Sequence, residues 1–447
     1  MKNKNILSII TFCWLFIGVS FAQNESRVNH DLECGTVTDE DAILYEQSIN
    51  REEFKQKMQY YLDNPTNRGV IQEYAVQIHI VQEDDGSGGA DINDIRDEFV
   101  SFINPYFNDI DIEFVECNPE LYHNNSEYYS LGEGDEDRDV AGDAMANTYN
   151  VADVINIYYV TYANGGCGWA RFPWKLPADY IVIANSCADN QSTTVHELGH
   201  YFGLYHTHQG GDESVTRDNG DGCWNCETAG DMLCDTPADP NLSSTASDWP
   251  SCLYTGTATD DCNSDSYNPM IDNIMSYADK ECRVIFTAEQ KARMEVFRDG
   301  DRDYLQIGCP CEKPQANCQN INVNLNAGGT ASIIPTDVDN GSTWDCGLDS
   351  WTVSPNSFDC SDVGGNVVTL TIIDDLGWES SCEATVTIVD NTNPIINTSA
   401  SNMTVECDGA GNVAAFNNWL NTNGGASASD ACGGIWSNDS EGLSDGC

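Results

Sequence analysis

Strand-like and helix-like hydrophobic patterns follow one another through residues 73–184. Residues 73–81 alternate hydrophobic and polar positions, which predicts a half-buried strand. The helix-like pattern lies in Asp91–Phe107, where hydrophobic residues recur every three or four positions after Asp91, a suitable N-cap. Such an order of elements predicts an α/β sheet packed by helices. The other strand-like runs are 110–115, 154–160 and 180–184.

Three further segments have clear local patterns. Asp41–Leu62 is amphipathic and predicts one helix, followed by a polar loop, Asn64–Gly69, that a protease could cut. The glycine-rich segment Gly165–Pro173 suits an edge strand to which an extended peptide could pair, or an ordinary hairpin. Thr287–Asp299 predicts another amphipathic helix.

The pattern changes near residue 312. No Lys, Arg or His follows Lys313, and strand-like runs such as Val367–Ile373 and Ala384–Val389 alternate with turn residues. This predicts a small β-sandwich over residues 312–392. A second β-module is expected to begin near residue 395 and to be incomplete at residue 447.

The N-terminus and the cysteine content indicate export. In residues 1–22, Lys2 and Lys4 precede the hydrophobic run Ile6–Val19, which predicts a cleaved signal peptide. A membrane anchor is the alternative, but the run is short for a span. The 20 cysteines are typical of an oxidising compartment, so we expect a secreted protein stabilised by disulfides.

The charge balance excludes some partners. The chain has 19 basic and 72 acidic residues, a net charge of -53. Nucleic acids and anionic membranes would be repelled, and we expect neither nucleic-acid binding nor membrane insertion. The excess of carboxylates suits calcium binding, although it can equally be a solvated surface.

The strongest chemical signal is H-E-x-x-H-x-x-G-x-x-H from His196 to His206. On a helix, His196 and His200 lie on one face and can bind one metal ion, with Glu197 beside it. Gly203 lets the chain turn back so that His206 supplies a third nitrogen. Three His ligands and an open position are typical of catalytic zinc. A chance match is the alternative, but three of the seven histidines stand at the required spacings.

Residues outside this motif suggest further roles. Cys34 could ligate the zinc and keep an enzyme latent, or form a disulfide with a cysteine between Cys117 and Cys282. Residues 218–222 and 230–237 resemble calcium-type loops, although each could be only an acidic turn. Met275 suits a turn beneath the metal, or plain core packing.

Together these motifs resemble the metzincin zinc endopeptidases, and within them the pappalysin family of the cytophagalysin or ulilysin type. The resemblance spans roughly residues 70–308, and Cys34-Gly35-Thr36 extends it into a propeptide. Residues 382–394 are similar to the HYR-like immunoglobulin-type repeats of secreted bacterial proteins. The family implies a catalytic domain with a twisted mixed sheet and an active-site helix.

The resemblance assigns roles to individual residues. It makes Glu197 the general base and Tyr277 a hydroxyl that assists the transition state. Its further assignments are the zinc ligands His196, His200 and His206, the Met-turn residue Met275, the latency residue Cys34, calcium binding by Asp231 and Thr236, and a Cys252–Cys282 disulfide.

Two other disulfide expectations are less specific. Cys262 is expected to pair with Cys223, Cys226 or Cys234. Two bridges of unknown pairing are expected within the first C-terminal module, among Cys318, Cys346, Cys360 and Cys382.

The sequence therefore predicts a secreted zinc endopeptidase that acts on proteins or peptides and is made as a zymogen. The expected parts are a signal peptide (1–22), a propeptide (23–69), a catalytic domain (70–308), a β-sandwich (312–392) and an incomplete β-module (395–447). The C-terminal modules are expected to contact cell-surface or extracellular material. The alternative is a surface adhesion protein with a vestigial protease domain, which the intact motif disfavours.

Overall fold

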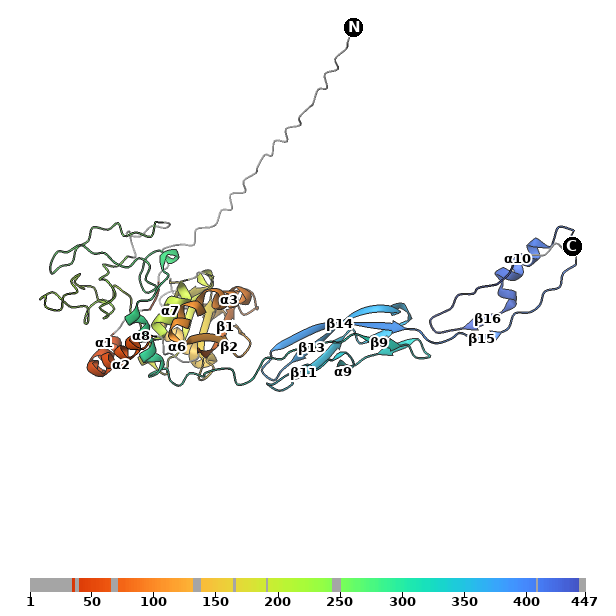
Figure 1. Cartoon of the computed structure of the whole chain (residues 1–447), viewed down its shortest axis with the longest axis horizontal. Helices are drawn as coiled ribbons and strands as arrows, with labels where there is room; N and C mark the ends of the chain where they lie inside the picture. The colour runs from red at the N-terminus through yellow and green to blue at the C-terminus, as the bar shows by residue number, and fades with distance from the viewer. Residues whose placement is uncertain are drawn as a thin grey trace, which may run out of the picture.

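The computed structural model describes residues 34–36, 40–65, 71–131, 138–163, 166–189, 192–242, 251–406 and 409–441. The predicted signal peptide lies outside these residues, as does most of the predicted cleavage loop. In Figure 1, an α/β body with two N-terminal helices beside it is followed by elongated C-terminal modules.

The body is built on a mixed sheet with strand order β2-β1-β5-β8-β7, in which β3 also pairs with β1. All pairs are parallel except β7 with β8 at one edge. The glycine-rich segment therefore contains an edge strand, one of its two predicted forms. The strands are β1 (Gln72–Gln82), β2 (Ile112–Glu116), β3 (Leu121–Asn124), β5 (Ile155–Val160), β7 (Gly168–Ala170) and β8 (Ile181–Ala184).

The prediction that residues 73–81 are half-buried is wrong. Every residue from Tyr74 to Val81 is buried, including Gln77 and His79. Strand β1 has paired neighbours along both edges and helices over both faces, so its polar side chains are enclosed as well as its hydrophobic ones. Gln77 and His79 are accommodated because both form hydrogen bonds.

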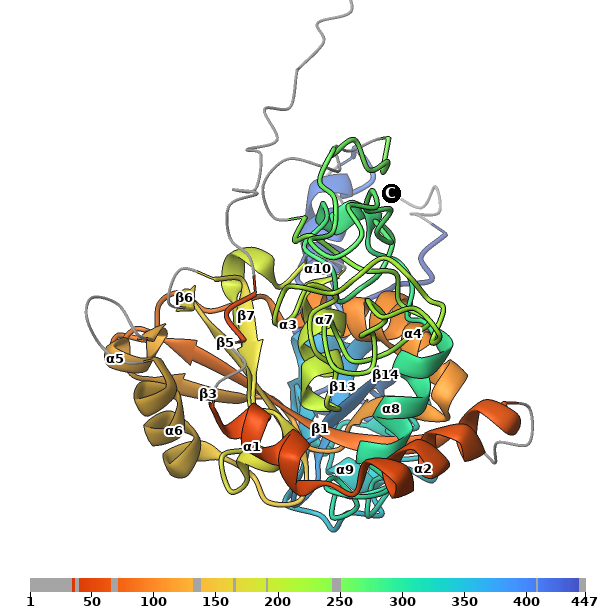
Figure 2. The same ribbon diagram turned by 90° about the vertical axis from the view of Figure 1, so that its left-hand side faces the viewer.

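Helices cover both faces of the sheet (Figure 2). Helix α3 (Ile92–Glu98) continues through a π-helical segment (Phe99–Ile103) into α4 (Asn104–Phe107), and the Asp91 side chain accepts a hydrogen bond from the Asn93 amide at its start. These helices and α7 (Thr193–Tyr201) pack on one face. Helix α6 (Arg138–Tyr149) packs on the other.

The N-terminal amphipathic stretch forms two helices rather than the predicted one. Helix α1 (Glu40–Ser48) ends just before Asn50, whose side chain accepts a hydrogen bond from the Glu53 amide and caps α2 (Arg51–Asp63). A side chain that can satisfy the first amides of a helix favours a new start at that point. Helix α2 packs beside α8 (Ala288–Arg298) (Figure 2).

Between α7 and α8 the described residues contain only one regular element, the short 3-10 turn Lys280–Cys282. Disulfides organise this long region. Cys223 pairs with Cys262, Cys226 with Cys234, and Cys252 with Cys282. The short elements elsewhere in the body are β4 (Ser130–Leu131), which pairs with β6 (Tyr162–Ala163), the helix α5 (Ser126–Tyr129), and the 3-10 turns Asn108–Ile110, Pro173–Lys175 and Asn185–Cys187.

The first C-terminal module is built mostly from strands around its own hydrophobic cluster. A sheet of order β11-β13-β14-β9 accompanies a two-stranded sheet, β10-β12. Its elements are β9 (Ile321–Asn324), β10 (Thr330–Ser332), α9 (Pro335–Val338), β11 (Ser350–Ser354), β12 (Ser357–Asp359), the 3-10 turn Cys360–Asp362, β13 (Gly364–Ile373) and β14 (Glu379–Val389).

The expectation of two bridges within this module is wrong. Cys318 pairs with Cys382 inside it, but Cys346 pairs with Cys311 in the preceding linker. Cys360 pairs with Cys432, 72 residues further along the chain. Pairing follows spatial proximity, which hydrophobic pattern alone does not reveal.

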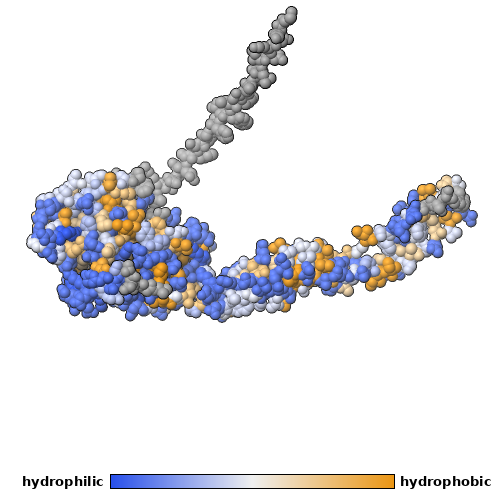
Figure 3. Space-filling model, viewed as in Figure 1, coloured by the Kyte–Doolittle hydropathy of each residue, from blue (hydrophilic) through white to orange (hydrophobic). Residues whose placement is uncertain are grey.

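The last segment is not built of strands alone, contrary to the expected β-module. Strands β15 (Ile395–Thr398) and β16 (Ser427–Ser429) pair, and α10 (Val413–Asn421) and the 3-10 turn Asn423–Gly425 lie between them. Hydrophilic residues cover most of the visible surface, with hydrophobic ones in separate patches (Figure 3). In the described part of the chain, no helix has the length and apolar character needed to span a membrane.

Candidate metal centre

Helix α7 carries the first part of the motif, and all nine of its residues are buried. The helix stops before Gly203, whose φ of 88° lies in the left-handed region. A Cβ at Gly203 would come within 2.2 Å of the Phe297 ring. Glycine is therefore required here both for the turn and for the close approach of the ring.

Backbone carbonyls orient two of the histidines. His196 Nδ1 lies 2.7 Å from the Ile274 oxygen, and His200 Nδ1 lies 2.7 Å from the Leu204 oxygen. Because a carbonyl only accepts, each Nδ1 carries the proton and donates it. Each Nε2 then has a free lone pair that points away from the helix backbone.

The three Nε2 atoms converge. His200 Nε2 lies 3.1 Å from His196 Nε2 and 3.0 Å from His206 Nε2. These atoms and Cys34 Sγ lie within 4.8 Å of one another. Unprotonated nitrogens facing one another at such distances repel unless a cation lies between them. This donor set fits a zinc ion, which favours three imidazoles in a tetrahedral site.

Burial keeps the imidazoles in the neutral form that binds metal. It lowers the pKa of His200 to about 3. Burial also lowers the pKa of His196 and of His206 well below the ordinary value, and their neighbouring histidines add to the effect. Burial therefore favours the neutral, metal-binding form of all three rings.

Glu197 lies beside the ligands and is itself buried. Its burial raises the pKa of the carboxyl to about 7, close to the value that suits proton transfer at neutral pH. The Thr36 hydroxyl donates a hydrogen bond to Glu197 Oε2 over 3.0 Å and accepts one from the Ala170 amide. The segment around Cys34 thus occupies the space in front of Glu197.

Cys34 is the free cysteine among the described residues, and the alternative of a disulfide is not observed. Its Sγ lies 3.5 Å from His200 Nε2. The Gly35 amide donates to the Gly168 oxygen over 2.7 Å, so the segment pairs with edge strand β7. The Tyr277 hydroxyl donates to the Cys34 oxygen over 3.0 Å. Tyr277 therefore faces the same space as the histidines.

Met275 lies directly beneath α7. A Cβ on Gly199 would come within 2.6 Å of its sulfur, so the helix rests closely on this side chain. The Met275 amide donates to Asn273 Oδ1, and Asn273 Nδ2 donates to Gln290 Oε1. Gln290 also forms the capping box of α8 with Thr287. The turn is thereby fixed to α8.

His208 does not contribute to the converging nitrogens. Its ring stacks on His206 at a centroid distance of 5.2 Å and lies 4.5 Å from the Tyr277 ring. It is thus a neighbour of the site rather than part of the donor set.

The two acidic loops differ in burial. Asp218 and Asp221 are surface residues whose side chains accept hydrogen bonds from the Gly220 and Cys223 amides. In contrast, Asp231 and Thr236 are buried together with Glu213 and Asp239. Burial raises the pKa of Asp231 to about 7 and that of Glu213 to about 8. Glu213 Oε2 is buried without a hydrogen-bond partner, whereas a hydrogen bond from the Thr236 side chain lowers the pKa of Asp231 and so opposes the effect of burial.

Carboxylate and hydroxyl oxygens are the ligand type that calcium prefers, but in the described part of the chain the carboxylates of Glu213, Asp231 and Asp239 do not bring three ligand atoms within 4.8 Å of one another. Arg217 already supplies one positive charge, 2.7 Å from Glu213 Oε1. That contact neutralises part of the negative charge of these residues but leaves Glu213 Oε2 without a partner.

Comparison with known proteins identifies the domain that contains this site. Residues 164–299 match the Peptidase_M43 family, described as pregnancy-associated plasma protein-A. This part of the chain is therefore similar to the pappalysin family of metallopeptidases. An extracellular metalloprotease of Podospora anserina is 31% identical to the chain over 158 residues, and one of Pyricularia oryzae is 32% identical over 154. These alignments cover 32% and 31% of the chain and 46% of each relative, so the match spans about half of their length.

Solved structures similar to the chain come from Tannerella forsythia. A promirolysin mutant matches with a TM-score of 0.43 at 17% identity, covering 61% of this chain and 97% of that one. Mature mirolysin in complex with a cleaved peptide matches with a TM-score of 0.40 at 19% identity, covering 53% and 96%.

Sequence reasoning missed several residues around the candidate metal centre. Thr36 was noticed only as part of a motif, and its bond to Glu197 depends on a contact 161 positions away. Glu213 and Asp239 resemble any other surface acids in so acidic a chain. The only sequence signal is the position of Asp239 two residues after the Gly230–Pro237 loop, and this signal is weak.

Proposed function

We propose that the chain is a secreted zinc-dependent endopeptidase made in a latent form. The convergence of three imidazole nitrogens, with Glu197 and Tyr277 facing the same space, supports this most strongly. The naming of the relatives as extracellular metalloproteases supports both the reaction and the secretion.

His196, His200 and His206 would hold the zinc, which when bound supplies a Lewis acid for water and for the carbonyl of the cleaved bond. Glu197 takes a proton from the attacking water and later donates it to the leaving amine. The Tyr277 hydroxyl donates a hydrogen bond to the oxygen that gains negative charge. The edge strand β7 pairs with the backbone of the substrate.

Latency is proposed to come from the segment 34–36. Cys34 would supply a fourth ligand as a thiolate, Thr36 would bind Glu197, and the Cys34 carbonyl would engage Tyr277. The segment also pairs with β7, where substrate is expected, so it would block every part of the site at once.

Calcium is proposed to bind the buried oxygens of Asp231, Thr236 and Glu213. Its role would be structural, because Asp231 Oδ2 accepts a hydrogen bond from Gln290 Nε2, which also contacts Asn273 of the Met-turn. The C-terminal modules are proposed to contact extracellular material, since they lie to one side of the body (Figure 1).

Cleavage of a casein and gelatin panel tests the proposal. The activated protein should cut both, lose activity with a zinc chelator and regain it with zinc. Glu197→Ala should remain folded and bind zinc but cut nothing. Cleavage that persists in this variant would overturn the proposal, and binding without cleavage by the wild type would favour an adhesion protein.

A further inference from the structure

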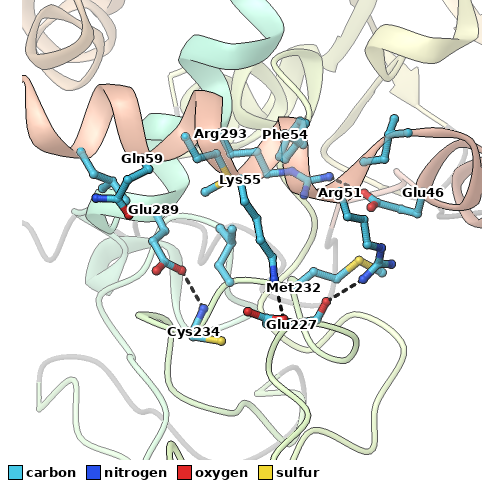
Figure 4. Close-up of a pocket in the computed structure, with 14 residues that line it drawn as sticks. Glu46, Arg51, Phe54, Lys55, Gln59, Glu227, Met232, Cys234, Glu289 and Arg293 are labelled. Carbon is cyan, nitrogen blue, oxygen red and sulfur yellow. Dashed lines mark hydrogen bonds and ion pairs between the residues drawn. The ribbon is translucent and has the colours of Figure 1, made fainter. Parts of the chain in front are cut away.

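Helices α1 and α2 cover a face of the body that is formed mainly by α8 and the 230–237 loop. Residues 40–65 contain the two consecutive helices α1 and α2, and we call this helical segment the hairpin. The anchor face is the surface of the body that the hairpin covers (Figures 2 and 4). The anchor face consists of Tyr205, Met232, Leu233, Ala292, Arg293, Val296 and Phe297.

Hydrophobic contacts form the main part of this interface. Met58 of α2 is buried against Leu233 and Ala292. The Phe54 and Phe297 rings lie 5.7 Å apart. Burial of several such side chains stabilises a complex in proportion to the apolar area removed from water.

A buried ion pair lies within this apolar interface. Glu46 Oε1 of the hairpin is 2.7 Å from Arg293 Nη2, and the two side chains are 7% and 3% exposed. The Tyr205 hydroxyl also donates to Glu46, and Arg293 Nε donates to the Gly203 oxygen. If the hairpin is bound but lacks this carboxylate, Arg293 is left buried without a counter-charge, which is costly.

The rim of the anchor face is negatively charged, opposite to the positive charge of Arg293 at its centre. Lys55 lies 2.6 Å from Glu227, and Arg51 donates to the Glu227 backbone oxygen (Figure 4). The Tyr61 hydroxyl donates to Asp299. The best occupant therefore has a carboxylate at its centre and donors at its edges, which is the arrangement that the hairpin presents.

From these contacts we infer that the hairpin stays bound to the anchor face after the chain is cut between it and β1. It then acts as a noncovalent inhibitor, and its release is a separate step in activation. The inference rests on the proposed latency for its consequence, but the binding itself uses neither the histidines nor Cys34.

Binding can be tested in the full-length chain without any catalytic readout. Glu197→Ala prevents self-digestion, and an inserted site for a specific protease between Pro65 and Ile71 allows one cut. After cutting, the N-terminal fragment should co-elute with the body on size exclusion at micromolar concentration. The fragment should also co-elute with the body when a metal chelator is present and when the chain carries Cys34→Ala. Separation of the fragment in either condition would overturn the inference.

A matched pair of variants tests the role of the ion pair. Glu46→Gln should raise the dissociation constant of the cut fragment at least about tenfold, because it leaves Arg293 without a counter-charge. Glu52→Gln makes the same charge change at an exposed position of α2 and should alter it less than about twofold. If the two substitutions changed the dissociation constant equally, the role given to the Glu46–Arg293 ion pair would be contradicted.

The catalytic consequence is measured separately in protein with an intact Glu197. The cut chain should cleave peptides faster with the Glu46→Gln fragment than with the wild-type one at equal concentration. Equal inhibition by both fragments, despite different affinities, would overturn the inhibitory role. No cleavage under any condition would reject the proposed function and leave the binding result standing.

Discussion

Tyr277 lies where a hydroxyl can act on a peptide carbonyl, because it already donates a hydrogen bond to the carbonyl of Cys34. We predict that Tyr277→Phe retains the ring contact with His206 but loses this donor. Removing one donor to a developing oxyanion typically lowers kcat about 100-fold or more. KM for a peptide substrate should change much less, and steady-state kinetics on the activated enzyme would show this. A parallel loss of zinc would point to a structural defect instead, so metal content is the control.

His79 is a buried base with no part in the proposed chemistry. Its Nε2 donates to Asn156 Oδ1, and its Nδ1 accepts from His123 Nε2. Burial lowers the pKa of His79 from 6.5 to about 3, and burial also lowers that of His123. His79 therefore binds a proton near pH 6.5 in the unfolded chain but stays neutral at that pH in the folded chain.

The stability contributed by this depressed pKa is complete above about pH 6.5 and is lost as the pH falls toward 3. Relative to His79→Gln, the free energy of unfolding should fall by about 1.4 kcal/mol per pH unit in that range. Urea unfolding of both proteins in the Glu197→Ala background at several pH values measures the difference. A constant difference between pH 7 and 5 would show that His79 takes up a proton in the folded state.

At the scale of elements, the turn that contains Asn273 and Met275, helix α8 and the 230–237 loop meet at Gln290. Its Oε1 accepts from Asn273 Nδ2 and from the Thr287 amide, and its Nε2 donates to Asp231. We predict that Gln290→Leu destabilises the protein by about 2–4 kcal/mol, because several buried polar groups lose their partner. The exposed Gln59→Leu should change stability by less than about 0.5 kcal/mol. Thermal unfolding of the two variants tests this, and similar melting temperatures would contradict it.

The elements that sequence predicted well are those whose pattern is local. Strands β5 and β8 are short hydrophobic runs, and α8 is capped by Thr287 with its capping-box partner Gln290 in the first turn of the helix. The order of the strands and the burial of β1 on both faces were not predictable, because they depend on which segments become neighbours.

The candidate site follows the same division. The positions of His196, His200 and His206 could be predicted because the motif encodes one helix and one turn. Thr36 and Glu46 could not, because each acts through a contact with a residue more than 150 positions away. The pairing of Cys360 with Cys432 was missed because the two cysteines lie 72 positions apart and no local pattern links them.

At the scale of the whole molecule, the body and the first C-terminal module meet around Trp378. Its indole Nε1 donates to the Cys117 oxygen over 2.8 Å, and the Arg96 guanidinium carbon lies 5.6 Å from its ring centroid. This contact is separate from the metal centre, and the body has its own hydrophobic core.

A chain that ends at Pro310 should therefore retain the activity of the body. This end keeps the Cys117–Cys309 disulfide and removes Cys311 together with its partner Cys346. We predict that kcat/KM on a short peptide stays within about threefold of the full chain, since a remote contact contributes little to the reacting centre. A loss of more than tenfold in a folded, zinc-loaded truncation would assign the module a direct part in catalysis.

The stacked rings of Tyr45 and Trp174, 4.5 Å apart, have an optical consequence. Trp174 stacks in turn on Phe172, whose ring meets the edge of His200. Departure of the hairpin exposes the Trp174 indole to water, and a wetter indole emits at longer wavelength. Activation should thus be visible as a red shift of fluorescence that Trp174→Phe abolishes, in real time and without any substrate.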